Sequence, residues 1–239
     1  MKITIAHLFH DLLNLYGESG NVLALEKALR QQNIEVEIKH FSLNDDSWDL
    51  ENADFIYIGA GTEQNQMLAL NKLKEYLNEI SQHVLNNKYI LATGNSIELF
   101  GKSIKDNNKE IETLGLFDYV TERTEKRLVS ECIFTHDEIE NKILGFENHQ
   151  GIIQNIQNPL FTVEKGFGSE TGSKVEGIKQ NNFYGTYLIG PILVRNPKFL
   201  EKICKDIILS KDINFKFEPF NFEIEQTAHE KFLSKYDKD

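Results

Sequence analysis

One stretch of the chain has the layout of a site for a nucleophile. Residues 89–101 read YILATGNSIELFG, which is a short apolar run, a turn at Gly94 and the beginning of a helical pattern. A strand that turns sharply into a helix lifts one side chain out of a sheet toward a substrate. Ser96 gives a partial match to the G-x-S-x-G pattern, but Glu98 replaces the second glycine, and its Cβ would crowd the bend. Ser96 is thus a candidate nucleophile for which the neighbouring sequence supplies no base.

Two other segments contain groups suited to ligand binding or proton transfer. Gly59 and Gly61 follow an apolar run, where backbone N–H groups can approach a phosphate or an oxyanion, or simply form a tight turn. Residues 145–151, GFENHQG, place Asn148 and His149 after a short strand. His149 is either a general base or a structural histidine that fixes a turn through its ring nitrogens.

Composition limits the classes of function open to the chain. It has 239 residues, 40% of them hydrophobic, and a formal net charge of -11. This length can build one large α/β domain, and we expect a single domain over residues 1–239. The acidic balance argues against nucleic-acid binding and against docking on anionic lipid through charge. No apolar run approaches a membrane span and no signal peptide is evident, so we expect a cytoplasmic protein without membrane insertion.

Neither the cysteines nor the histidines are spaced like metal ligands. Cys132 and Cys204 lie in a strand-like run and a helical pattern, where a thiol packs as a small apolar side chain. Two cysteines do not make a disulfide framework, and the seven histidines are scattered. We therefore expect no metal and no cofactor.

The first hundred residues alternate between strand and helix patterns. This order predicts an α/β fold with a mostly parallel central sheet flanked by helices on both faces. Strands are expected at residues 2–9, 34–40, 54–61 and 89–92, and helices at 17–32 and 66–85.

The rest of the chain is richer in strand patterns, separated by glycine or asparagine turns. Residues 166–172 are expected to form a mobile loop, and residues 215–222 an aromatic, irregular segment. Strands are expected at 114–122, 127–135, 142–147, 161–165 and 177–188, and helices at 196–209 and 223–236.

Four segments occur together in one order: HLFHDLLNLYGESGN at 7–21, IGAGTEQ at 58–64, GFENH at 145–149 and GTYLIGPIL at 185–193. The set resembles the class I glutamine amidotransferases of the cobyric acid synthase type, and within them the small glutaminase subunit of lipid II isoglutaminyl synthase. The resemblance covers nearly the whole chain and implies a flavodoxin-like core. It also implies a Mur-ligase-like partner subunit, which uses ATP to amidate the D-glutamate of the lipid II stem peptide.

The family's chemistry is implied to be attack by a cysteine thiolate on the glutamine amide, with a histidine as base and backbone N–H groups holding the oxyanion. Carried onto this sequence, the cysteine position is Gly94 and the histidine position is Ile189. Glycine has no functional group and isoleucine cannot accept a proton. The positions expected on the ligand side are Gly59, Gly61, Glu98, Arg127 and Asn148.

Three hypotheses follow. The chain is a glutaminase-like subunit without glutaminase activity that scaffolds or regulates a synthetase partner. Alternatively, it is a hydrolase with relocated chemistry, using Ser96 with His149. In the third, it is a binding module for glutamine or another amino acid, in which Glu98 would favour a cationic ligand.

Overall fold

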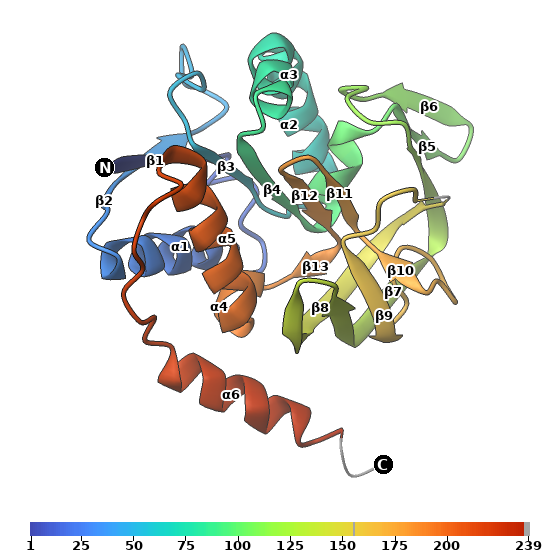
Figure 1. The fold of residues 1–239 in the computed structure, drawn as a ribbon. Helices are drawn as coiled ribbons and strands as arrows, with labels where there is room; N and C mark the ends of the chain where they lie inside the picture. Colours follow the sequence, from blue (N-terminus) through green and yellow to red (C-terminus); the bar gives the residue numbers. More distant parts are fainter. Residues whose placement is uncertain (155, 237–239) are drawn as a thin grey trace.

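The structure is a computed structural model that describes residues 1–154 and 156–236. In this part of the chain, one sheet has six strands in the order β11-β12-β4-β3-β1-β2 (Figure 1). Its strands run parallel except for β11, which pairs antiparallel with β12. The predicted mostly parallel α/β fold is confirmed. The strands are β1 (Lys2–Leu8), β2 (Glu35–Phe41), β3 (Phe55–Ile58), β4 (Tyr89–Thr93), β11 (Ile178–Gln180) and β12 (Phe183–Thr186).

Helices cover both faces of this sheet, and the alternation of side chains along β1 shows why. Ile3 and Ile5 point into one apolar cluster with α1 and α5, whereas Ala6 and Leu8 point into a second cluster with α2 and α3. A parallel strand buried on both faces is mostly apolar on both, as β1 is apart from Thr4 and His7. The helices are α1 (Ser19–Gln31), α2 (Glu63–Glu75), α3 (Leu77–Leu85), α4 (Ile192–Arg195), α5 (Pro197–Lys211) and α6 (Glu223–Leu233).

The expectation of a single helix over residues 66–85 is wrong in one respect, because the structure has two helices there, α2 and α3. The break lies at Tyr76, whose backbone N–H bonds to Leu73 O instead of continuing the α-helical ladder. The Tyr76 ring stacks on Trp48 with 4.7 Å between centroids, and its hydroxyl accepts a hydrogen bond from Trp48 N. This long-range contact, which periodicity does not reveal, holds the chain at the break.

A second, mostly antiparallel sheet lies beside the first (Figure 1). Its centre is a long hairpin, which contains the strands expected at 127–135 and 142–147. Its strands are β5 (Ser103–Asp106), β6 (Lys109–Glu112), β7 (Val120–His136), β8 (Ile139–Ile153), β9 (Phe161–Lys165), β10 (Val175–Glu176) and β13 (Leu188–Ile189). The strand expected at 177–188 is thus divided among β11, β12 and the beginning of β13.

Two further expectations need correction. The strand expected at 114–122 begins only at Val120, because the N–H groups of Leu116 and Phe117 bond to Phe100 O rather than to a neighbouring strand. The hairpin of β5 and β6 was not expected; Asn107, with φ of 53°, lies in its turn.

The C-terminal part follows the sequence pattern. The helix expected at 196–209 is α5, the helix expected at 223–236 is α6, and residues 215–222 are irregular. Among the described residues, no helix combines the length and apolar character that crossing a membrane requires.

Glu176, at the end of β10, gives a test of the junction between the two sheets. Its buried carboxylate accepts hydrogen bonds from Tyr187 N at 2.7 Å and Thr186 Oγ1 at 2.8 Å. Burial raises the pKa of Glu176 to about 8, although both hydrogen bonds act to lower it. The protonated form is therefore favoured in the folded state, and the fold loses stability as pH rises from about 4.3, the value in an unfolded chain, toward 8.

We expect Glu176→Gln to become more stable relative to the wild type as pH increases from 5 to 8, because the amide cannot ionise. Urea midpoints at pH 5, 6.5 and 8 measure this difference. A difference that stays constant over this range would contradict the expectation.

Candidate functional site

The turn at the end of β4 leaves no room for a side chain at its first residue. Gly94 has φ of +60° and begins a 3-10 helix, η1 (Gly94–Phe100), where an ordinary helix had been expected. A Cβ at this position would lie 2.5 Å from Ala60 Cβ and 2.8 Å from Ile189 Cγ2. Position 94 is therefore restricted twice, by its backbone conformation and by the two apolar side chains that fill the adjacent space.

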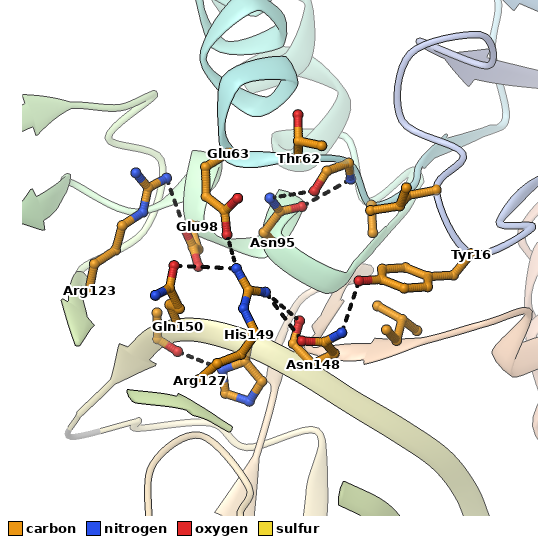
Figure 2. Close-up of a pocket in the computed structure, with 15 residues that line it drawn as sticks. Tyr16, Thr62, Glu63, Asn95, Glu98, Arg123, Arg127, Asn148, His149 and Gln150 are labelled. Carbon is orange, nitrogen blue, oxygen red and sulfur yellow. Dashed lines mark hydrogen bonds and ion pairs between the residues drawn. The ribbon is translucent and has the colours of Figure 1, made fainter. Parts of the chain in front are cut away.

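A cavity of about 240 Å³ opens beside this turn, between the first sheet and the β7–β8 hairpin (Figure 2). Several residues singled out from the sequence line it, namely Gly61, Glu98, Arg127, Asn148, His149 and Ile189. Other charged and polar residues also line it, and they were not expected from the sequence: Tyr16, Glu63, Asn95, Arg123 and Gln150. They lie on segments far apart in the chain, so only the fold brings them together.

Arg127 occupies the mouth of the cavity (Figure 2). Its guanidinium donates to Asn148 Oδ1 at 3.2 Å and to Gln150 Oε1 at 3.3 Å, and it forms an ion pair with Glu63. Asn148 in turn donates to the Tyr16 hydroxyl at 3.1 Å. This chain of contacts joins β7, β8, α2 and the segment before α1, and it places a cation, a carboxylate and an amide at the entrance.

Glu98 lies deeper in the wall and is only 2% exposed. Its carboxylate accepts a hydrogen bond from Gln66 Nε2 at 2.8 Å and lies 3.7 Å from Arg123 Nη2. The other terminal nitrogen of Arg123, Nη1, pairs with Asp106. Burial raises the pKa of Glu98, while Gln66 and Arg123 act to lower it. The protein itself thus supplies the positive charge beside Glu98, instead of leaving that carboxylate for a cationic ligand.

The glycine turn after β3 is held by the first residues of η1. Gly59 and Gly61 both lie where a Cβ would collide with the segment before α1, since it would come within 2.3 Å of Leu13 O at Gly59. Asn95 accepts a hydrogen bond from Gly61 N at 3.2 Å and donates to Gly61 O at 3.0 Å. The Gly61 N–H, a candidate oxyanion donor, is therefore already bonded within the protein.

The structure does not join Ser96 and His149 as nucleophile and base. The buried Ser96 hydroxyl donates to Gly59 O. His149 uses Nδ1 to contact Gly151 O at 2.6 Å, and its ring stacks on Tyr187 with 3.8 Å between centroids. Burial lowers the pKa of His149 to about 4, so the ring is neutral near pH 7. Its Nε2 has no hydrogen-bond partner among the described residues.

A buried carboxylate that the sequence analysis missed lies beneath the turn. Glu18 accepts hydrogen bonds from Tyr57 OH at 2.7 Å, Thr93 Oγ1 at 2.6 Å and Gly190 N at 2.8 Å. Thr93 precedes Gly94 and Gly190 follows Ile189, so Glu18 ties together the two segments, through the Thr93 side chain and the Gly190 backbone N–H. Burial raises the pKa of Glu18, and its three donors oppose that change. The sequence gives little indication of this role, since Glu18 is simply an acidic residue within a run of glycines and small polar residues.

The two cysteines are buried and free, as expected. Burial raises the pKa of both thiols, to about 12 at Cys204. Neither lines the cavity. They are therefore poor nucleophiles and pack as apolar side chains.

The chain is similar in sequence to proteins of one known family. Residues 4–197 match the model of the CobB/CobQ-like glutamine amidotransferase domain. The chain is 29% identical, over 98% of its length and 96% of the relative's, to the lipid II isoglutaminyl synthase subunit GatD of Staphylococcus aureus. The GatD subunit of Streptococcus pneumoniae is 28% identical over 98% of this chain and 88% of its own. A cobyric acid synthase of Clostridium botulinum is 28% identical over 61% of this chain, which is 31% of that protein.

Solved structures share the fold at low sequence identity. A glutamine amidotransferase of Thermotoga maritima covers 97% of this chain and 94% of its own, with a TM-score of 0.53 and 11% identity. The glutaminase domain of Trypanosoma brucei CTPS covers 92% of this chain and 98% of its own, with a TM-score of 0.52 and 12% identity.

The crowding at Gly94 can be separated from its backbone conformation. Gly115 has nearly the same φ, +64°, but no atom lies within 4 Å of a Cβ built there. We expect Gly94→Ala to lower the free energy of unfolding by about 3 kcal/mol and Gly115→Ala by about 1 kcal/mol. Urea denaturation of the two variants measures the difference. Equal losses would mean that Ala60 and Ile189 move aside at little cost.

The pairing of Glu98 with Arg123 gives a second test. Arg123→Met leaves a buried carboxylate without its cation, and we expect a loss of about 3 kcal/mol in unfolding free energy at pH 7. Adding Glu98→Gln should recover part of that loss, because the unpaired charge is removed. A double-mutant cycle measures the coupling. Strictly additive single and double variants would show that the two residues do not interact.

Proposed function

Because the chain belongs to the CobB/CobQ-like glutamine amidotransferase family, we propose that it retains the fold and subunit role of that family but does not hydrolyse glutamine. One observation supports this most directly. The position of the nucleophile is Gly94, and the space that a thiol would need is occupied by Ala60 and Ile189. The substitution at 94 is therefore accompanied by packing that excludes the missing group.

Each step of the family's reaction lacks its group at this site. The thioester route needs a thiolate, a base that moves the proton and donors for the oxyanion. Gly94 supplies no sulfur, Ile189 accepts no proton, and the Gly61 N–H is bonded to Asn95. These three features lie on different segments of the chain. Either of the first two would be expected to stop the reaction, and the third would slow it, because the loss of one oxyanion donor costs about 10²–10³ in rate.

The role of the chain is inferred from its relatives. Two of them are subunits named for lipid II isoglutaminyl synthase, and the match to each covers 98% of this chain. We propose that the chain pairs in the cytoplasm with a Mur-ligase-like, ATP-dependent synthetase that modifies the peptidoglycan precursor lipid II. There it would scaffold or regulate the synthetase instead of supplying ammonia from glutamine.

A second role, as a ligand-binding module, is supported by the surviving cavity. Arg127 and Glu63 form an ion pair with each other at the entrance, and both are about 40% exposed. A bound ligand would exchange that ion pair for a carboxylate on Arg127 and an ammonium group on Glu63. A zwitterionic amino acid would present both charges. Thermal shifts with single amino acids test this role, since a ligand at 100 times its Kd stabilises the fold by about 2.7 kcal/mol.

The absence of glutaminase activity can be measured with a matched gain-of-function variant. We expect the wild type to release no ammonia from glutamine above background, alone or with the synthetase. The triple variant Ala60→Gly/Gly94→Cys/Ile189→His restores the nucleophile, the base and the space between them. We expect glutamine-dependent ammonia release from it, or covalent labelling of the new thiol by a glutamine-like electrophile.

Turnover by the wild type that disappears in Ser96→Ala or His149→Gln would contradict the proposal and establish relocated chemistry. For the partner role, co-expression with the synthetase should give a complex that co-elutes in size-exclusion chromatography. Separate elution of the two chains would contradict that role.

A further inference from the structure

Five large apolar side chains are exposed on one side of the molecule, next to the cavity. They are between 39% and 83% exposed, and we call them the apolar belt: Leu15, Leu23, Val129, Val194 and Ile224. Single exposed apolar side chains are common on protein surfaces, whereas a group of them rimmed by polar residues marks a contact surface. The contacts of their neighbours show that these five belong to one surface.

The belt begins at the mouth of the cavity. Leu15 lines the cavity itself. Val129 lies directly opposite Asn148 in the β7–β8 ladder, and directly opposite residues present their side chains on the same face of a sheet. Two residues further along β7, Glu131 continues this face and lines a groove. The outer face of the hairpin therefore joins the cavity to the groove.

The groove has a volume of about 560 Å³ and lies between β8, α4 and α6. Apolar side chains from all three elements line it: Leu144, Val194, Ile224, Ala228 and Phe232. Those on α6 recur every four positions, so they form one stripe along the helix. His229, the buried residue of α6, anchors the helix by placing Nε2 2.8 Å from Lys142 O. The apolar stripe is thus not what attaches α6 to the body, and Ile224 and Ala228 stay exposed.

Helix α1 brings Leu23 to the same side. A Cβ at Gly20 would lie 3.8 Å from Val194 Cγ2 of α4. Lys27 forms an ion pair with Glu225 of α6. Positions 20, 23 and 27 are neighbours on one face of a helix, so Leu23 lies between these two contacts.

The charged side chains that line the groove have partners within the chain, with one exception. Glu225 pairs with Lys27, and Glu131 accepts a hydrogen bond from the Tyr236 hydroxyl. Arg195 is exposed and has neither an ion pair nor a side-chain hydrogen bond among the described residues. The other three arginines of the chain each pair with a carboxylate. An unpaired guanidinium beside apolar walls suits an apolar segment that carries an acidic side chain.

We propose that the apolar belt is the docking surface for the synthetase subunit, which inserts an apolar segment into the groove, pairs a carboxylate with Arg195 and covers the mouth of the cavity. This docking rests on the proposed function, because it names the surface of that same pairing. Helix α6 supports the choice of occupant. The match to the family model ends at residue 197, before α6, whereas the matches to both GatD subunits cover 98% of this chain and so extend into it. A second copy of the chain is less suited, because two chains of net charge -11 repel each other.

The test measures the affinity of the full chain for the synthetase by isothermal titration. We expect Ile224→Asp to weaken binding about tenfold or more, because it places a charge against apolar surface. The matched control is Ile213→Asp, since Ile213 is 77% exposed, against 83% for Ile224. Ile213 follows α5 near the start of β1, where Lys211 Nζ donates to Lys2 O, and its variant should bind within about twofold of the wild type.

A second pair of variants tests the charge at the groove. Arg195→Glu should weaken binding and remove part of its dependence on salt concentration. Lys109→Glu makes the same change in net charge on β6, at the side of the molecule remote from α6 (Figure 1). It should leave both the affinity and its salt dependence unchanged.

Urea midpoints of each variant separate lost binding from lost folding. Ile224 is the second residue of α6, where a carboxylate is favourable, so its variant should fold. Equal binding by the wild type and Ile224→Asp would overturn the docking surface and leave the proposed pairing in place, as would equal weakening by Ile213→Asp. Absence of binding by the folded wild type would overturn both. Self-association of the wild type that Ile224→Asp abolishes, without binding of the synthetase, would assign the groove to a second copy and overturn the proposal.

Discussion

The carboxylate of Glu18 is the interaction on which the geometry of the site depends. It is fully buried, yet it receives three hydrogen bonds, from β3, from the end of β4 and from the segment after β13. A buried acid of this kind is tolerated only when its oxygens are satisfied, and removing one donor leaves a costly group behind. The segments that contain Gly94 and Ile189 are thus held together by a residue that is not among those lining the cavity beside them.

This arrangement separates the frame of the site from its chemistry. The frame consists of the glycine turn after β3, η1 with its Asn95 contacts, and the Arg127–Asn148 chain at the entrance. All of it is formed by hydrogen bonds within the protein, so it needs neither nucleophile nor base to persist. The packing beside Gly94 is close, since a Cβ at this position would lie 2.5 Å from Ala60 Cβ and 2.8 Å from Ile189 Cγ2.

Local patterns predicted much of the fold and the positions of several lining residues. The strands of the parallel sheet are apolar runs between turns, and Gly61, Asn148 and Ile189, which line the cavity, lie in short segments that occur in a recognisable order. What escaped prediction depends on contacts between distant segments. Tyr76 ends α2 because it meets Trp48, and the charge of Glu98 is balanced by Arg123 across two elements. Neither contact leaves a period or a motif in the sequence.

The close packing beside Gly94 also limits which sequence changes could give this site a nucleophile and a base. A chain that regained only the thiol would meet Ala60 and Ile189, and one that regained only the imidazole would have nothing to activate. Intermediate sequences would therefore bear a cost in folding without any return in catalysis. Selection acting on one substitution at a time would therefore find no gain in activity at either position. A hydrophobic contact of a few atoms can in this way require several substitutions at once before any one of them is favourable.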